Sequence, residues 1–152
     1  MPRPPKDRRV EYLPEVRFFK PAGVRRTDLE EVVLNVEELE AIRLKDIEEL
    51  NQEECAERME VSRPTFQRVL TAGRKKIAEA LIMGKGIRIQ GGDFSVALSQ
   101  VDCLNCGEQF VVPVYHTRHR GEVYCPHCGE IVRKTKGGRK RRMHGQNPGL
   151  NK

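Results

Sequence analysis

The sequence predicts a mainly α-helical protein in which a helical domain is followed by a small β domain and a basic tail without regular structure. Three observations lead to this fold class. Apolar residues recur with helical periodicity from Asp28 to Met83, a stretch that only Pro64 and Gly73 interrupt. Two cysteine pairs then fall in a short Gly-bounded region, and the chain ends in a run rich in Gly, Lys and Arg.

Composition divides the chain into five segments. The first has prolines at 2, 4, 5, 14 and 21, which a regular helix does not tolerate, and the last is rich in Gly, Asn, Lys and Arg and has no core to bury. The predicted segments are a basic extended arm (1–30), a helix-turn-helix domain of three or more helices (31–92), a linker (93–100), a β domain (101–135) and a disordered basic tail (136–152).

The charge distribution indicates an anionic partner. The net charge is +6, and the excess lies at both ends of the chain. Arg3, Arg8 and Arg9 lie near the start, and no acidic residue follows Glu130. We expect both ends to seek phosphates. The alternative is that charged tails simply keep a small protein in solution.

The sequence also limits where the protein works. No stretch approaches the roughly 20 apolar residues of a membrane span. The amino terminus is rich in Arg and Pro, where a signal peptide has an apolar segment. We therefore expect a cytoplasmic, nucleoid-associated protein with no membrane partner.

The first predicted helix has an apolar stripe and a charged remainder. We expect the stripe to pack on the core and the charged residues to face solvent. The stripe consists of Val36, Leu39, Ile42 and Ile47, with Leu44 near its margin, and the charged residues are Glu37, Glu38, Glu40, Arg43 and Lys45.

A second, short helix opens at a capping box formed by Asn51 and Glu54. Its inward residues are predicted to be Cys55, Ala56 and Met59, which makes Cys55 a packed small side chain rather than a reactive thiol. A turn at Glu60–Val61 should follow.

The third helix is predicted to begin after Ser62, whose hydroxyl can cap it, with Pro64 in the first turn. Its predicted buried face is Phe66, Val69, Leu70, Gly73, Ile77 and Leu81. Two capped helices joined by a short turn make a helix-turn-helix.

The exposed face of this third helix has the residue types that bind DNA. Arg63, Thr65, Gln67 and Arg68 can bond to base edges in the major groove. Beyond them, Thr71, Arg74, Lys75 and Lys76 are candidates for phosphate contacts, together with Arg3, Arg8 and Arg9 of the arm. An ordinary three-helix bundle with a basic solvated face is the alternative.

Four cysteines form the second candidate site. Cys103 and Cys106 make one CxxC pair, Cys125 and Cys128 another, and 18 residues separate the pairs. This spacing is typical of one structural Zn²⁺ in a tetrahedral site. Gly107 and Gly129 follow the pairs, and short strands are expected over 109–115 and 121–124.

This arrangement resembles a zinc ribbon over about 101–134. Paired disulfides and a rubredoxin-like iron site are the alternatives. His116, His119 and His127 are expected at the surface or on nucleic acid, because four thiolates already complete a tetrahedron.

Long stretches of the chain resemble a known family. The segments 34–46 (LNVEELEAIRLKD) and 51–70 (NQEECAERMEVSRPTFQRVL) are similar to the bacterial and archaeal domain-of-unknown-function family 134, a set of predicted DNA-binding proteins. The segments 2–10, 20–24 and 84–92 also resemble it, so the match covers roughly 1–92. Members often have Cys where this chain has Asp7, so no metal or redox role is implied there.

The same helices are similar to region 4 of bacterial sigma factors. This resemblance implies that Arg63, Thr65, Gln67 and Arg68 face the groove.

The leading hypothesis is therefore a non-enzymatic transcriptional regulator that binds specific double-stranded DNA. The sequence offers no nucleophile–base pair, open metal position or phosphate loop. A homodimer is expected because one recognition helix covers few base pairs. The ribbon would touch DNA, RNA polymerase or another protein. An RNA- or ribosome-associated module and a redox protein with iron in the ribbon are the alternatives.

Overall fold

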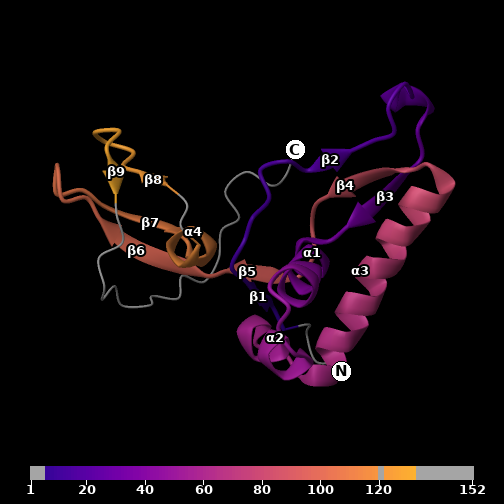
Figure 1. The fold of residues 1–152 in the computed structure, drawn as a ribbon, viewed down its shortest axis with the longest axis horizontal. Coiled ribbons are helices and arrows are strands. Elements are labelled where there is room, and N and C mark those ends of the chain that lie inside the picture. The colour runs from indigo at the N-terminus through magenta and orange to yellow at the C-terminus, as the bar shows by residue number, and fades with distance from the viewer. Residues whose placement is uncertain (1–5, 120–121, 133–152) are drawn as a thin grey trace. The chain divides into compact units, whose positions relative to one another are not determined.

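The computed structural model describes residues 6–119 and 122–132, which fall into two compact units (Figure 1). The first contains described residues 6–10 and 14–95, and the second contains 11–13 and the described residues from 96 onward. Four helices and several small sheets make up the described chain. The fold is therefore mixed α and β, which corrects the mainly α-helical prediction.

The first unit is built on a three-stranded sheet that the sequence predicted only in part. Its order is β2 (Phe18–Phe19), β4 (Gly86–Ile89) and β3 (Glu31–Leu34). The middle strand β4 runs antiparallel to β2 and parallel to β3. Of these strands, only β4 has a local sequence signal, the short alternating run Ile87–Arg88–Ile89 between glycines. Strand β2 lies within the segment expected to be an extended arm.

The helix-turn-helix forms the crossover between β3 and β4. Parallel strands need a long connection between them, and here the helices supply it. The crossover consists of α1 (Val36–Ile42), the π-helical segment η2 (Arg43–Ile47), α2 (Gln52–Met59) and α3 (Arg63–Met83). In Figure 1, α3 is the long helix, and it packs on β3 and β4.

Three further short elements lie wholly or mostly in the first unit. The 3-10 helix η1 (Arg26–Asp28) precedes β3, and β1 (Arg8–Val10) pairs with β5 (Phe94–Val96). Strand β5 lies in the segment 93–100 that was predicted as a linker.

The local signals for α2 and α3 are confirmed. The Glu54 amide donates to Asn51 Oδ1 over 2.8 Å, and the Asn51 amide donates to Glu54 Oε2 over 3.1 Å. The Thr65 amide donates to Ser62 Oγ over 3.3 Å at the start of α3. Between the helices, Glu60 takes a left-handed φ of 56°, which reverses the chain.

The core of the helix-turn-helix also follows the prediction closely. Its fully buried members are Ala41, Leu44, Cys55, Ala56, Met59, Phe66 and Leu70. Because Cys55 is enclosed in this core, burial raises the pKa of its thiol.

Two residues of the predicted apolar faces are exposed instead. Ile47 is 75% exposed, whereas Leu44, predicted at the margin, is completely buried. The π-helical turn of η2 widens the helix and shifts its later residues off the 3.6-residue period. Leu81 is also 75% exposed, because the 21 residues of α3 extend beyond the 7-residue α1.

The charged residues of α1 are the largest departure from prediction. Glu37, Glu38, Glu40 and Arg43 are buried rather than solvated. Helix α1 is packed by α3 on one side and by β1 on another, so its polar face is also covered. The predicted stripe therefore describes only part of its buried surface.

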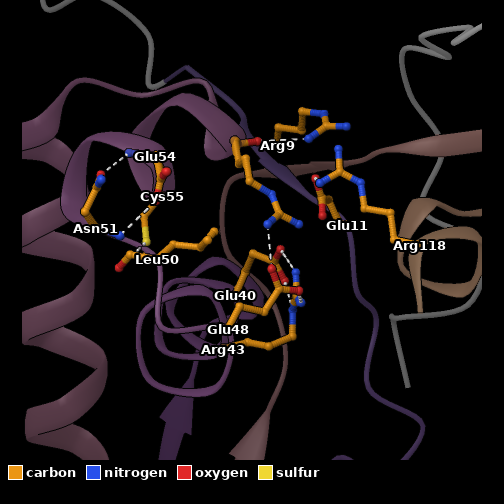
Figure 2. A network of polar contacts seen from close by, with 11 residues as sticks. Arg9, Glu11, Glu40, Arg43, Glu48, Leu50, Asn51, Glu54, Cys55 and Arg118 are labelled. Carbon is orange, nitrogen blue, oxygen red and sulfur yellow. Dashed lines mark hydrogen bonds and ion pairs between the residues drawn. The ribbon is translucent and has the colours of Figure 1, made fainter. Parts of the chain in front are cut away.

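Ion pairs compensate the burial of Glu40 and Arg43 (Figure 2). Arg43 donates to both carboxylate oxygens of Glu40, over 2.6 and 3.0 Å. Glu48 bridges Arg43 and Arg58, the latter on α2. Burial raises the pKa of Glu48, but the two guanidinium groups outweigh it and hold the pKa below its usual value. This network ties α2 to the end of α1.

The second unit contains two β hairpins. Strand β6 (Leu98–Asp102) pairs with β7 (Gln109–Pro113), and β8 (Val123–Tyr124) pairs with β9 (Ile131–Val132), both antiparallel. The short helix α4 (Val114–Arg118) follows β7 and replaces the last residues of the strand predicted over 109–115.

An amino-terminal segment completes this unit. Glu11 is buried, and its carboxylate lies 3.4 Å from Arg118 Nη1 (Figure 2). The Tyr115 amide donates to the Glu11 carbonyl over 3.1 Å, and the rings of Tyr12 and Tyr115 are 4.7 Å apart. Residues 11–13, predicted within the arm, thus belong structurally with the cysteine region.

None of the helices in the described chain combines the length and the apolar character that crossing a membrane requires.

Candidate nucleic-acid interface and metal centre

The structure places the four predicted base-reading residues on the first two turns of α3. Arg63, Gln67 and Arg68 are exposed, and Thr65 is half-buried. The Ser62 cap fixes the first turn, and Phe66 anchors the opposite face in the core. A rigid helix end therefore presents these side chains at the surface.

Gln52, which the sequence analysis missed, connects these residues. Arg63 Nε donates to Gln52 Oε1 over 3.2 Å, and Gln52 Nε2 donates to Gln67 Oε1 over 2.5 Å. Gln67 Nε2 in turn donates to Thr71 over 3.2 Å. Gln52 directly follows the Asn51 cap, and this position at the start of α2 was the signal that could have identified it.

Two further contacts orient the arginines. Arg68 Nη2 donates to Thr65 Oγ1 over 3.3 Å. Arg63 Nη1 lies 2.9 Å from Glu53 Oε1, and both side chains are well exposed. Because an exposed ion pair contributes little, a phosphate or a base can replace Glu53 at low cost.

Several predicted phosphate ligands contact acidic groups of their own unit. Arg74 pairs with Asp46 at 2.6 Å, and Lys76 pairs with the buried Glu38 at 2.9 Å. Thr71 and Lys75 are exposed. Lys76 therefore has a structural role, because it neutralises a buried carboxylate.

The predicted ligands of the arm also have intramolecular contacts. Arg8 pairs with Asp93 at 3.4 Å, and Arg9 donates to the Arg58 carbonyl over 3.0 Å. The Arg58 carbonyl is near the carboxyl end of α2, where helix carbonyls lack partners within the helix. Arg3 lies outside the described residues.

The helix-turn-helix portion is almost electrically neutral. Residues 6–95 contain 17 Lys and Arg and 18 Asp and Glu. The last 20 residues contain 8 Lys and Arg and no acidic residue, and they lie outside the described residues, as does the predicted disordered tail (136–152). The basic excess of the chain is therefore not carried by residues 6–95.

The four cysteines lie in two turns of the same design. The Cys103 amide donates to the Glu108 carbonyl, and the Gly107 amide donates to the Cys103 carbonyl, both over 2.8 Å. Cys125 repeats this pattern with Glu130 and Gly129, both over 2.9 Å. The glycines have φ values of 76° and 75°, which explains why each pair is followed by Gly.

The two turns bring all four sulfur atoms together. They lie within 4.8 Å of one another, with 3.6 Å between Cys103 and Cys128 and 3.6 Å between Cys106 and Cys125. A disulfide would require about 2.05 Å. A tetrahedron of metal–sulfur bonds of about 2.3 Å places sulfurs about 3.8 Å apart, so the thiols can hold a metal ion.

The electrostatics of the cysteine cluster are asymmetric. Asn105 Nδ2 lies 3.6 Å from Cys128 Sγ. This contact and a hydrogen bond from the Glu130 backbone lower the pKa of Cys128 to about 6. The Glu108 amide favours the Cys106 thiolate, but burial and the other thiols outweigh it and raise the pKa of Cys106 to about 12. Asn105 is a second residue that the sequence analysis missed.

No histidine of the described residues belongs to this cluster. In the described part of the chain, the candidate metal-binding group consists of the four cysteines. The His119 ring instead lies 4.3 Å from the Tyr115 ring.

Fold and site together define a helix-turn-helix protein with a second unit that can bind a metal ion through four cysteines. The chain belongs to the family described as protein of unknown function DUF134, which matches residues 1–97. This confirms the resemblance to domain-of-unknown-function family 134 that the sequence shows.

Relatives in two organisms match most of the chain. A UPF0251 protein of Halothermothrix orenii is 58% identical over 130 residues, which cover 86% of this chain and 96% of the relative. A UPF0251 protein of Clostridium botulinum strain 657 is 53% identical over 129 residues, 85% of this chain and 80% of the relative. Because these matches are longer than 97 residues, they extend into the second unit. No solved structure matches the chain.

Proposed function

We propose that the protein is a non-enzymatic transcriptional regulator that binds specific double-stranded DNA through the first two turns of α3. One observation carries this proposal. Gln52 links Arg63 and Gln67 in one hydrogen-bonded array on the exposed end of a capped helix. A positioned array of this kind is what recognition of base edges requires.

The residue chemistry supports the major groove as the target. Gln67 can bond to both the N6 and N7 positions of adenine, and Arg63 and Arg68 can each bond to guanine O6 and N7. The deep, narrow major groove of RNA helices does not admit side chains in this way. The same array therefore favours DNA over structured RNA.

The charge distribution supports specific rather than general binding by this unit. Since residues 6–95 are nearly neutral, the unit itself attracts DNA only weakly at long range. The basic residues after Glu130 would supply most of the salt-dependent affinity. In this arrangement α3 selects the sequence and the carboxyl-terminal cations hold the duplex.

We further propose that the four cysteines hold one structural Zn²⁺. A closed set of four thiolates without an open position is typical of structural zinc. The small core of this unit includes two of these cysteines. It consists of Cys103, Cys125 and Val132, with Val101 and Phe110 packed against them. When bound, the metal would contribute much of the folding free energy of the second unit.

Selection from a randomised duplex library at about 150 mM salt tests the DNA proposal. We expect one enriched motif, which Arg63→Ala, Gln67→Ala and Arg68→Ala each relax. Arg25→Ala is a matched control, because it removes one exposed charge outside α3. Salt-sensitive binding without an enriched motif would contradict the proposal, as would tighter binding to structured RNA than to any duplex.

Metal analysis of the purified protein tests the zinc proposal. A colourless protein with about one zinc per chain is expected. Absorption bands of thiolate-bound iron would instead favour the redox alternative.

A further inference from the structure

The carboxyl-terminal turn of α3 exposes three consecutive large apolar side chains. Leu81, Ile82 and Met83 are 75%, 81% and 69% exposed. None of them belongs to the core that α1, α2 and α3 share. Single exposed apolar residues are common in proteins, but a contiguous group marks an interaction surface.

We infer that this turn is a self-association surface at which a second copy of the chain binds. The alternative of a nucleic acid does not fit, because the last turn contains no basic residue. Helix carboxyl termini normally favour cations, so three apolar residues there indicate apolar contact rather than solvation.

The charges around the turn suit a second copy of the same surface. Lys85 pairs with Glu79 at 2.8 Å, so the rim of the surface carries both signs. A twofold interface must be complementary to itself, and a rim with both signs meets this condition. With 17 basic and 18 acidic residues in 6–95, two units would approach without net repulsion.

The surface is also of a suitable kind for a specific dimer. A stable interface covers about 800 Å² on each partner, with an apolar centre and a polar rim. The three apolar residues form such a centre, and exposed Ala78 continues the same side of the helix toward its middle.

The length of α3 relates this surface to DNA, a step that rests on the proposed function. Gln67 and Ile82 are separated by 15 helical residues, or about 22 Å at 1.5 Å per residue. Two helices that meet at Ile82 at roughly a right angle would hold their reading ends about 31 Å apart, close to the roughly 34 Å of one turn of DNA. The inference predicts two half-sites spaced by about 10 base pairs.

Sedimentation of the full metal-loaded chain without DNA tests the surface independently of the proposed function. We expect a dimer for the natural chain, and for Ile82→Lys a self-association weakened at least about 100-fold. A lysine suits the carboxyl end of a helix, so the variant should fold, which circular dichroism verifies. Ile47→Lys is the matched control, since Ile47 is 75% exposed in the same unit, and should remain dimeric.

A natural chain that stays monomeric at about 100 μM would overturn the inference. So would an Ile47→Lys variant that dissociates as readily as Ile82→Lys. Once a DNA motif has been selected, Ile82→Lys should bind a duplex with one half-site as tightly as the natural chain does. It should lose the additional affinity that the natural chain gains from a duplex with two half-sites. Failure to find a motif would contradict the proposed function and leave the sedimentation result valid.

Discussion

The side-chain amide of Gln52, on the first turn of α2, donates a hydrogen bond to Gln67 Oε1 on α3 over 2.5 Å. Gln52 also accepts from Arg63 Nε, so one residue of α2 orients two side chains of the proposed recognition helix. Gln52→Ala should therefore weaken binding to the selected DNA about 10-fold, with little effect on binding to unrelated DNA. Competition binding with both duplexes measures the difference.

Glu57→Ala provides the control for this change, because Glu57 is an exposed residue of the same helix. An equal loss of affinity for specific and unrelated DNA in Gln52→Ala would show that Gln52 does not position base-reading groups.

Gly73 allows α3 to approach α1 closely. A Cβ atom at this position would lie 3.1 Å from Glu38 Cβ, 3.1 Å from Ile42 Cδ1 and 3.3 Å from the Glu38 carbonyl oxygen. Alanine favours a helix by about 1 kcal/mol over glycine, but Glu38 Cβ and the Glu38 carbonyl oxygen belong to or adjoin the backbone of α1 and cannot easily move. Gly73→Ala should lower the free energy of unfolding by about 1 kcal/mol, and Gly73→Val by more.

Urea unfolding followed by circular dichroism measures both Gly73 variants. Ala78→Gly is a useful comparison because Ala78 is exposed on the same helix. If Gly73→Ala stabilised the protein, helix propensity would outweigh the close packing against α1.

Glu48 makes the stability of the helix-turn-helix depend on acid pH. Its pKa in the folded protein is lowered, so the ionised group stabilises the fold above its unfolded pKa, and this contribution is lost as the pH falls through the folded pKa. Glu48→Gln should lower the free energy of unfolding at neutral pH by about 3 kcal/mol. The loss stays at this value rather than a larger one because Arg43 still pairs with Glu40.

Thermal unfolding of the natural chain and of Glu48→Gln across the acid range tests this sign. The two stabilities should converge as the pH falls. A difference that stays constant with pH would mean that the variant acts through packing rather than through its charge.

Removal of the proposed Zn²⁺ should unfold the second unit and spare the first. The helix-turn-helix has a core of its own, whereas the small core of the second unit includes two of the four cysteines of the proposed metal site. A zinc chelator and Cys106→Ser should both abolish amide protection in β6–β9 and leave α1–α3 protected. Hydrogen exchange measures both units at once, and loss of protection in α1–α3 would contradict this independence.

The cations of the carboxyl-terminal segment should set the salt dependence of DNA binding. Replacing Arg139, Lys140, Arg141 and Arg142 by Gln removes four of them. The slope of log K against log salt should fall in magnitude by up to about 4, because each phosphate contact contributes about 0.9. The selected motif should stay the same, whereas a changed motif would assign base reading to this segment.

The sequence by itself determined the elements that depend on neighbouring residues. Asn51 with Glu54 and Ser62 with Pro64 located the starts of α2 and α3, because a cap satisfies amides only a few residues away. The CxxC pairs and their glycines located the cysteine site for the same reason, since each turn closes within six residues. The family followed from these same segments.

Only the tertiary structure decided which polar residues are buried and which distant segments meet. Glu40 and Arg43 appear solvated on a helical wheel, but β1 and α3 cover α1 and turn them into an internal ion pair. Gln52 reaches Gln67, and Glu11 reaches Arg118, across separations that no local pattern encodes. Caps and periodicity act over a few residues, whereas burial and long-range pairing depend on how all the elements pack together.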